Sequence, residues 1–149
     1  MLEVKGDIWR CHGEGEWVVV TTNGATRRDG ACIMGRGVAL QAAQLYPKLP
    51  FELGDRLRMF GNRVFLFDDR KIASFPVKHS WEQKADLKLI ESSARQLAVH
   101  VREKEIPIIY LPRPGCGNGR LDWEKEVKPV LSKILDDRFC VLEREEVKQ

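Results

Sequence analysis

Two apolar segments of this chain are each followed by a glycine-rich loop and then by a helical pattern. Residues 17–22 are rich in β-branched side chains, and residues 106–111 form a second apolar run. Apolar runs without polar alternation are typical of strands buried on both faces, as in a parallel sheet covered by helices. The alternation of strand and helix patterns therefore predicts an α/β protein with helices on both faces of its sheet.

The remaining patterns complete this architecture. Further strands are expected at residues 2–5, 64–67, 71–75 and 139–142, and helices at residues 36–46, 52–59, 86–104 and 122–135. Asp68 and Asp69 predict a hairpin turn, and Pro47 and Pro50 are expected to end the helix over residues 36–46. The predicted inward-facing residues of the three longer helices are Val38, Ala42 and Leu45; Leu87, Ile90, Ala94, Leu97 and Val101; and Trp123, Val127, Val130 and Ile134.

Length, charge and cysteine usage limit the possible functions. The 149 residues fit one domain spanning 1–149, and the formal net charge of +3 permits a polyanionic partner without requiring one. The N-terminus lacks the pattern of a signal peptide, and no apolar run approaches the roughly 18 residues of a membrane span. Four widely spaced cysteines then predict a cytoplasmic protein with free thiols. Because the cysteines and histidines show no ligand spacing, we expect no metal site.

Both glycine-rich loops have features of phosphate-binding loops. They span residues 24–37 and 113–121, and each leads into a helical pattern. Glycines let backbone N–H groups face an anion, and the free N–H groups of a helix N-terminus attract phosphate. The first loop has neither the Walker A nor the dinucleotide-binding spacing, and taken alone it is equally compatible with a flexible turn. Two such loops at strand–helix junctions predict a ligand whose two phosphates lie between them.

Three segments together resemble the macrodomain family. They are residues 4–8 (Val-Lys-Gly-Asp-Ile), Asn23 with residues 30–40, and residues 115–123 (Gly-Cys-Gly-Asn-Gly-Arg-Leu-Asp-Trp). Residues 75–81 (Phe-Pro-Val-Lys-His-Ser-Trp) resemble a branch of ADP-ribose glycohydrolases that holds a lysine in the cleft, represented by the DarG antitoxin and the terminal ADP-ribose protein glycohydrolase. The resemblance implies a single macrodomain, with a three-layer α/β/α fold around a mixed, mostly parallel sheet and a deep cleft for ADP-ribose.

The resemblance also implies ligand roles for particular residues. Asp7 would accept a hydrogen bond from the adenine amino group beside Ile8, and Asn23 would hold the distal ribose. A turn or cap role is the alternative for Asp7 and Asn23. The two loops would wrap the diphosphate, mainly through backbone N–H groups. The other implied ADP-ribose contacts are Thr22, Gly30, Met34, Gly35, Arg36, Gly37, Val38, Pro76, Gly115, Cys116, Gly117, Asn118, Gly119, Arg120 and Leu121.

Lys78 falls on the catalytic lysine of the branch that the chain resembles. Without that resemblance, a lone lysine after a strand is best interpreted as a solvated surface charge. Burial in a cleft would lower its pKa, so that a neutral amine could attack the anomeric carbon of the ribose and form a Schiff base after ring opening. Alternatively, a protonated lysine would help the base to depart by donating a hydrogen bond to it. Both routes are open at the level of the sequence.

At Gly119 the sequence differs from some members of this branch. The protein-directed enzyme has an acidic residue at that position, which helps to release its lysine-bound intermediate. Its absence here favours the DNA-directed members, to which the Gly-Cys-Gly-Asn-Gly form of the second loop is also similar. Asp122 follows three residues later and has two interpretations: it replaces the acid, or it caps the next helix.

The surroundings of Lys78 suggest contacts with a modified base. His79 and Trp81 are expected near the base, and Trp81 either stacks on an extruded base or packs against the helix over residues 86–104. The first glycine-rich loop is surrounded by three arginines, Arg27, Arg28 and Arg36. One interpretation is that they bind DNA phosphates, and the alternative is that they are ordinary surface charges.

The leading interpretation is an enzyme that removes ADP-ribose from a nucleobase, specifically thymidine, in ADP-ribosylated single-stranded DNA, without a cofactor. The alternatives are a non-catalytic ADP-ribose reader and a hydrolase of ADP-ribosylated protein or small ADP-ribose metabolites. The branch also implies a DNA ADP-ribosyltransferase toxin as a partner. A domain of this size is expected to be a monomer with no membrane contact, and the chain is expected to end in a charged tail at residues 143–146 without the antitoxin's further domain.

Overall fold

The computed structural model describes residues 1–144, which form one six-stranded sheet with flanking helices. The strands are β1 (Leu2–Lys5), β2 (Trp17–Asn23), β3 (Phe65–Phe67), β4 (Ile72–Lys78), β5 (Ile109–Pro112) and β6 (Phe139–Glu143). The helices are α1 (Ile8–Gly13), α2 (Gly37–Leu45), α3 (Leu49–Phe60), α4 (Leu87–Glu103), α5 (Lys128–Leu131) and the π-helical turn η1 (Trp123–Val127). Residues 145 and 146 of the predicted charged tail lie outside the described residues.

The sheet has the strand order β1-β6-β5-β2-β4-β3. Every pair is parallel except β3 with β4, which pair antiparallel across the predicted hairpin, so the prediction of a mixed, mostly parallel sheet is confirmed. Because five strands run in the same direction, their carboxyl ends meet at one edge of the sheet. Both glycine-rich loops leave from this edge, after β2 and after β5, which is where ligands bind in sheets of this type.

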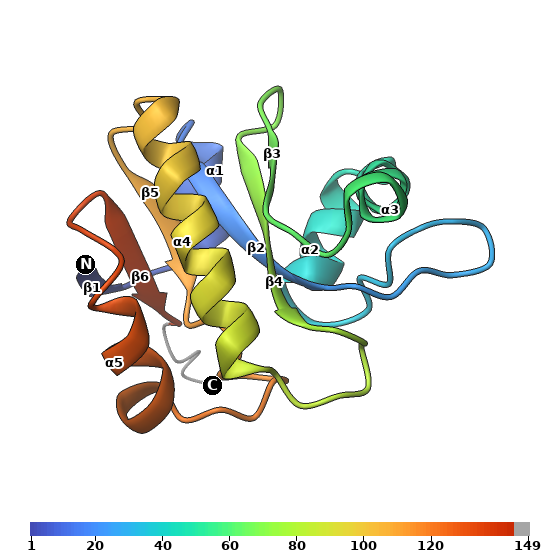
Figure 1. Ribbon diagram of the computed structural model, residues 1–149. Coiled ribbons are helices and arrows are strands. Elements are labelled where there is room, and N and C mark those ends of the chain that lie inside the picture. The colour runs from blue at the N-terminus through green and yellow to red at the C-terminus, as the bar shows by residue number, and fades with distance from the viewer. Residues whose placement is uncertain (145–149) are drawn as a thin grey trace, which may run out of the picture.

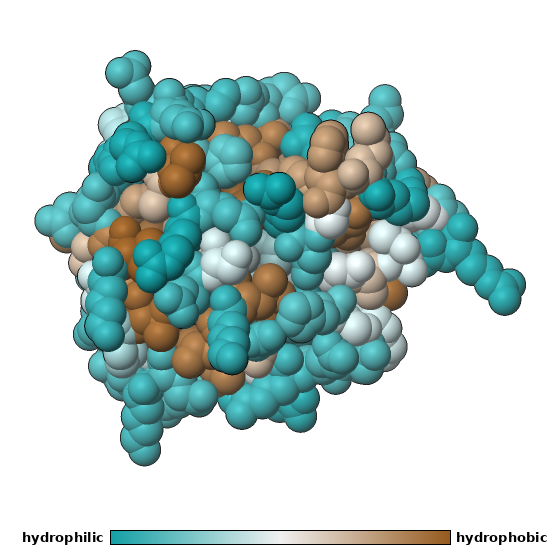
Figure 2. Space-filling view, viewed as in Figure 1, coloured by the Kyte–Doolittle hydropathy of each residue, from teal (hydrophilic) through white to brown (hydrophobic). Residues whose placement is uncertain are grey.

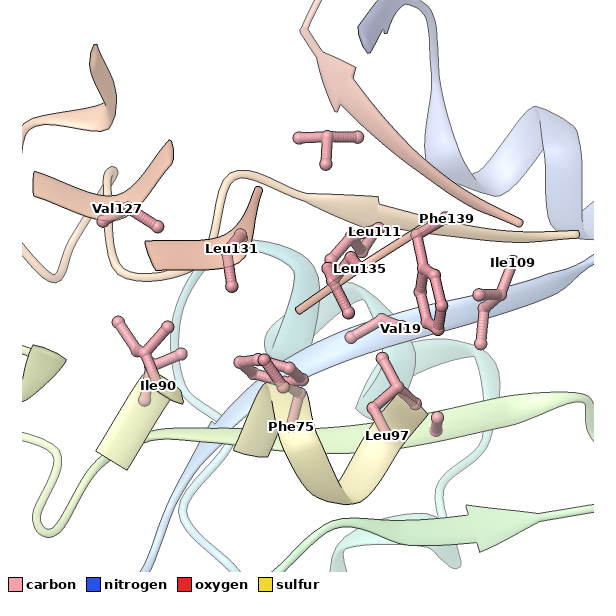
Figure 3. Close-up of a cluster of buried hydrophobic side chains, with 14 of the residues drawn as sticks. Val19, Phe75, Ile90, Leu97, Ile109, Leu111, Val127, Leu131, Leu135 and Phe139 are labelled. Carbon is pink, nitrogen blue, oxygen red and sulfur yellow. The ribbon is translucent and has the colours of Figure 1, made fainter. Parts of the chain in front are cut away.

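Helices cover both faces of the sheet, as a three-layer α/β/α fold requires. Figure 1 shows α4 and α5 in front of the strands and α1 behind them. One apolar core lies under α4, η1 and α5, where Phe75, Leu97 and Phe139 pack together (Figure 3). The second core lies under α1, α2 and α3 and includes Val18 and Leu53. The outer surface above the first core is mostly hydrophilic (Figure 2), and no helix within residues 1–144 is long and apolar enough to cross a membrane.

The structure corrects three predictions around the second core. Helix α1 was not predicted, because it has only six residues and no fully buried side chain that would give it a periodic face. Leu45 was expected to face inward but is 54% exposed, since α2 buries Ala39 and Ala42 instead. Pro50 does not end α2: it lies in the first turn of α3, where a missing N–H group costs no hydrogen bond.

The predicted long helix over residues 122–135 is divided in the structure. Its beginning is the π-helical turn η1, in which the N–H group of Val127 donates to the carbonyl oxygen of Asp122 five residues earlier. This wider turn changes which later residues face the core: Leu131 and Leu135 are fully buried, the predicted Ile134 is half-buried and packs against the core, and the predicted Val130 lies outside the core. The predicted face of α4 is confirmed, with its apolar residues buried or packed against the core.

Candidate functional site

A cleft of about 1290 Å³ opens at the carboxyl ends of the strands, between the two glycine-rich loops. Its walls come from segments far apart in the sequence: the start of α1, the end of β2, the start of α2, the end of β4 and the loop after β5. The structure brings most of the predicted site residues together here. They are Asp7, Ile8, Thr22, Asn23, Gly35, Arg36, Gly37, Val38, Lys78, Trp81, Gly115, Cys116, Gly117, Asn118, Gly119 and Leu121.

Asp7 and Ile8 form one end of the cleft at the start of α1. The carboxylate Oδ1 of Asp7 accepts a hydrogen bond of 2.9 Å from the N–H group of Trp9, so Asp7 caps this helix. Asp7 lines the cleft, and within residues 1–144 its second oxygen, Oδ2, has no hydrogen-bond partner. The cap role is therefore confirmed, and the free oxygen leaves an acceptor for a donor such as an amino group.

Asn23 shapes the first glycine-rich loop from inside. Its Nδ2 donates to the carbonyl oxygen of Ile33 at 2.9 Å, and its Oδ1 accepts from the N–H group of Ala25 at 2.8 Å. Both ends of the amide are thus used to fold the loop, which confirms the turn interpretation of Asn23. Its position at the cleft wall leaves contact with a ribose as a prediction.

The first glycine-rich loop presents backbone to the cleft. Gly37 begins α2 with a φ of 55°, a left-handed conformation that favours glycine, and nothing lies within 4 Å of the Cβ position of Gly35. The first N–H groups of a helix have no partner within the helix, so those of α2 are available to an anion in the cleft.

The second glycine-rich loop leaves three consecutive N–H groups free. The N–H groups of Cys116, Arg120 and Leu121 donate to carbonyl oxygens within the loop. In contrast, those of Gly117, Asn118 and Gly119 make no hydrogen bond within the described part of the chain. Three unpaired N–H donors in one turn, opposite the N-terminus of α2, are suited to binding a diphosphate.

Lys78 ends β4 inside this cleft and is only 9% exposed. A register irregularity between β2 and β4 pairs Asn23 with Lys78, and such irregularities re-aim side chains next to functional sites. The amine Nζ lies 3.2 Å from the carbonyl oxygen of Asn118 and 3.4 Å from that of Trp81. Burial lowers the Lys78 pKa from its ordinary value of 10.5, and the positive charges of Arg36 and Arg120 lower it further.

Trp81 stands at the same end of the cleft. It is 47% exposed and lies outside the buried core beside α4, which leaves much of its ring free for a ligand. The guanidinium carbon of Arg36 lies 6.0 Å from the centre of a Trp81 ring, the outer limit of a cation–π contact. Side chains from the first loop and from the segment after β4 therefore meet over Lys78.

Hydrogen bonds fix the segment that carries Trp81. The N–H group of Asp86 donates to the carbonyl oxygen of Val77 at 2.9 Å, and that of Ala85 donates to the carbonyl oxygen of Gly119 at 3.0 Å. Figure 1 shows the yellow-green loop after β4 beside the orange loop after β5. The two loops that surround Lys78 thus hold each other in place.

Five predicted contacts lie outside the walls of the large cleft. Gly30 lies under α3, where its carbonyl oxygen accepts from Arg58, and Met34 is buried in the core beneath α2 and α3. Pro76 is enclosed within β4, and its carbonyl oxygen accepts from Ser93. The other two are His79, which pairs with Asp86, and Arg120, which lines a smaller chamber adjoining the cleft.

Asp122 is a capping residue, as one of its two interpretations predicted. Its Oδ1 accepts a hydrogen bond of 2.7 Å from the N–H group of Lys125 at the start of η1. Sequence patterns missed other wall residues, among them Gln41, Arg113 and Glu124, because a cleft wall imposes no periodic signal on its polar members. The structure shows no group of three potential metal-ligating side chains within residues 1–144.

Replacing Arg36 with glutamine is expected to raise the pKa of Lys78. A nearby positive charge disfavours a protonated amine, so its removal favours protonation and moves the pKa upward, toward 10.5. Titration of the Lys78 side chain by NMR measures the shift. Arg102→Gln removes the same charge from the far end of α4 and should leave the titration unchanged; equal shifts in both variants would contradict the direct effect of Arg36.

Asp86→Ala is expected to destabilise the fold by about 1 kcal/mol, because Asp86 is the N-cap of α4. Its Oδ1 accepts from the N–H group of Lys88 at 2.9 Å, and its Oδ2 pairs with His79 at 2.8 Å. Urea unfolding measures the change. Asp86→Asn is the matched control, since asparagine caps helices as well as aspartate does and should retain most of the stability.

The sheet order, the two glycine-rich loops and the cleft at the carboxyl ends of the strands match the macrodomain fold of solved structures. The chain is similar to the macrodomain of Thermus aquaticus DarG, with 27% identity, a TM-score of 0.77 and 97% of each chain covered. It is also 31% identical over 102 residues to the DNA ADP-ribosyl glycohydrolase of Mycobacterium tuberculosis. That match covers 62% of this chain and 29% of the relative, so the chain spans under a third of this curated relative.

Thermosipho africanus provides both a structural match and a sequence match to the chain. The structure of its DarTG in complex with ADP-ribose has a TM-score of 0.79 at 20% identity, with 99% of this chain and 42% of that chain covered. A DNA ADP-ribosyl transferase–DNA ADP-ribosyl glycohydrolase fusion protein of that organism is 33% identical over 61 residues, which are 41% of this chain and 16% of the relative. No protein-family model matches the chain.

Proposed function

We propose that this chain binds ADP-ribose in the large cleft and hydrolyses the bond between ADP-ribose and a thymidine base in DNA. The observation that carries the proposal is Lys78, a buried amine in a cleft whose two glycine-rich loops present free backbone N–H groups. A relative named DNA ADP-ribosyl glycohydrolase supports this reaction, and the Thermosipho africanus DarTG complex with ADP-ribose supports this ligand.

The proposed pose follows from the distribution of donors and acceptors. The free carboxylate oxygen of Asp7 takes a hydrogen bond from the adenine amino group at one end of the cleft. The N–H groups of α2 and those of Gly117, Asn118 and Gly119 bind the diphosphate from opposite sides. The distal ribose then lies near Asn23 and Lys78, which places its anomeric carbon at the chemically active end.

In the proposed reaction, the bond between the anomeric carbon and the base nitrogen breaks. Water supplies a hydroxyl group to that carbon, and the remaining proton of the water ends on the base nitrogen. Lys78 can serve in either of two ways: as an ammonium that donates a hydrogen bond to the departing base, or as a neutral amine that first attacks the anomeric carbon. Two carbonyl oxygens accept hydrogen bonds from the amine and favour the ammonium, whereas burial and the neighbouring arginines lower the Lys78 pKa and favour the neutral amine.

The crowding at Gly119 supports a DNA substrate over a protein carboxylate. A Cβ atom at this position would lie 2.5 Å from the carbonyl oxygen of Gly115 and 2.8 Å from the Cβ of Ala85. No side chain fits there without movement of both loops, so an acidic residue of the protein-directed kind has no space.

Substrate comparison tests the proposal. The purified protein is incubated with single-stranded DNA carrying thymidine-linked ADP-ribose, with a protein ADP-ribosylated on glutamate, and with acylated ADP-ribose. We expect release of ADP-ribose from the DNA with the highest kcat/KM. Faster release from the protein or from the metabolite would overturn the DNA assignment, and binding of ADP-ribose without any release would make the chain a reader.

Several further expectations belong to this proposal. The fusion of a transferase with a glycohydrolase in Thermosipho africanus supports a DNA ADP-ribosyltransferase as the partner whose product this chain removes. We propose that the chain acts in the cytoplasm as a monomeric single domain and that hydrolysis needs no cofactor. Chelator-treated protein should keep its activity, and light scattering should give the mass of one chain.

A further inference from the structure

A second, smaller chamber of about 400 Å³ adjoins the cleft at its Lys78 end. It shares five wall residues with the cleft, including Lys78, Arg36 and Trp81, and adds Glu82, Gln83 and Arg120. Its volume falls within the range of small-molecule sites. A group attached to the anomeric carbon of a ribose at Lys78 would therefore have this chamber directly beside it.

Arg120 reaches the chamber from an unusual backbone position. Its φ is 66°, a left-handed conformation that glycine adopts freely and that most other residues avoid. Two other non-glycine residues have a positive φ. Lys71 lies in the turn between β3 and β4, Glu105 lies in the turn after α4, and neither lines a cavity. Arg120 alone among them directs a side chain into a cavity, which points to a role for the guanidinium group.

The chamber carries an excess of positive charge. Arg36, Lys78 and Arg120 all contribute to its wall, against one acidic side chain, Glu82. The Glu82 carboxylate already accepts a hydrogen bond from the Ser80 hydroxyl. Neither Arg36 nor Arg120 forms an ion pair with any residue from 1 to 144. Two unpaired guanidinium groups beside an amine are suited to binding an anionic ligand. A neutral base alone would leave both guanidinium groups without a partner.

Trp81 indicates which anion fits. A half-exposed indole ring beside unpaired arginines combines a stacking surface with phosphate-binding groups, as in sites that hold single-stranded nucleic acids. A peptide carboxylate would use the charges but not the ring.

We propose that the small chamber receives the modified nucleotide, with its base beside Trp81, and that Arg120 together with Arg36 binds a phosphodiester group flanking it. This inference rests on the proposed function and goes one step further. It makes Arg120 a specificity-determining residue that favours ADP-ribose on a single DNA strand over ADP-ribose on a nucleoside without phosphates.

Arg120→Gly is the informative variant, because glycine adopts the left-handed conformation and keeps the path of the loop. The probes are ADP-ribosyl-thymidine as a free nucleoside and the same unit within a single-stranded oligonucleotide. We expect the native protein to prefer the oligonucleotide by about 10-fold or more in kcat/KM, and Arg120→Gly to lose most of that preference. The slope of log Kd for the oligonucleotide against log salt should fall by about 0.7 for each phosphate group that the variant no longer binds.

Two controls make the test specific. Arg120→Lys keeps the charge and should retain part of the preference, and Arg102→Gln removes a charge from the exposed end of α4 and should change nothing. An equal decrease on both probes in Arg120→Gly, or an unchanged preference, would overturn the proposal. So would tighter binding of an ADP-ribosylated glutamyl peptide than of the oligonucleotide.

The same probes separate this inference from the proposed function. If the native protein releases no ADP-ribose from either probe, the proposed function fails, and the two Kd values still decide the role of the chamber. A preference for the oligonucleotide in Kd that Arg120→Gly removes supports the chamber, and the lack of any such preference overturns it.

Discussion

Lys78→Ala is expected to lower kcat on thymidine-linked ADP-ribose by about 10²- to 10⁴-fold, the range for loss of a residue that transfers or shares a proton in the transition state. The affinity for ADP-ribose should change little, because in the proposed pose the diphosphate binds to free backbone N–H groups of other segments. Single-turnover kinetics and calorimetric titration measure the two quantities separately.

The matched control for this variant is Lys133→Ala, which removes an exposed lysine after α5. It should retain native turnover. If Lys78→Ala keeps native turnover as well, Lys78 is a structural residue and the catalytic proposal is wrong. If both turnover and ADP-ribose affinity collapse, the amine holds the ligand or the loops rather than acting on the bond.

Gly119→Glu is expected to cost about 3 kcal/mol in the free energy of unfolding, as overpacking does in well-filled regions. The clash involves backbone: the added Cβ would meet the Gly115 carbonyl oxygen at 2.5 Å and the Ala85 Cβ at 2.8 Å. Any relaxation would also break the hydrogen bond between the Ala85 N–H group and the Gly119 carbonyl oxygen. ADP-ribose affinity should therefore fall together with stability.

Gly117→Ala provides the comparison within the same loop. Nothing lies within 4 Å of a Cβ at this position, so the free energy of unfolding should stay within about 0.5 kcal/mol of the native value. Denaturant unfolding measures both variants. Equal stability of Gly119→Glu and Gly117→Ala would show that the loops move apart freely and that an acidic residue is sterically acceptable.

The sequence predicted those parts of the fold that depend on local patterns. The buried run of β2, the inward face of α4 and the hairpin between β3 and β4 each have a characteristic period or turn. The placement of both glycine-rich loops at one edge of the sheet followed from the parallel arrangement of the strands. Helix α1 and the π-helical turn η1 were missed, because six residues and one widened turn leave too little periodic signal.

The site was predictable only in outline. Lys78 and the glycine loops were recognised by their resemblance to a family, and the structure adds why these residues matter: the burial of the amine and the free N–H groups. The direction of the Arg120 side chain depends on a left-handed backbone angle, and the crowding at Gly119 depends on a residue 34 positions earlier, Ala85. Neither can be obtained from sequence spacing, since both arise from contacts between loops.

The position of ADP-ribose relative to Lys78 tests the central claim most directly. A crystal structure of the complex would give the distance between the Lys78 Nζ and the anomeric carbon of the distal ribose. We expect about 3–4 Å, with the diphosphate between the N-terminus of α2 and the loop at residues 117–119. A bound ADP-ribose whose distal ribose lies out of reach of Lys78, or no binding in the cleft at all, would contradict a glycohydrolase that acts through this lysine.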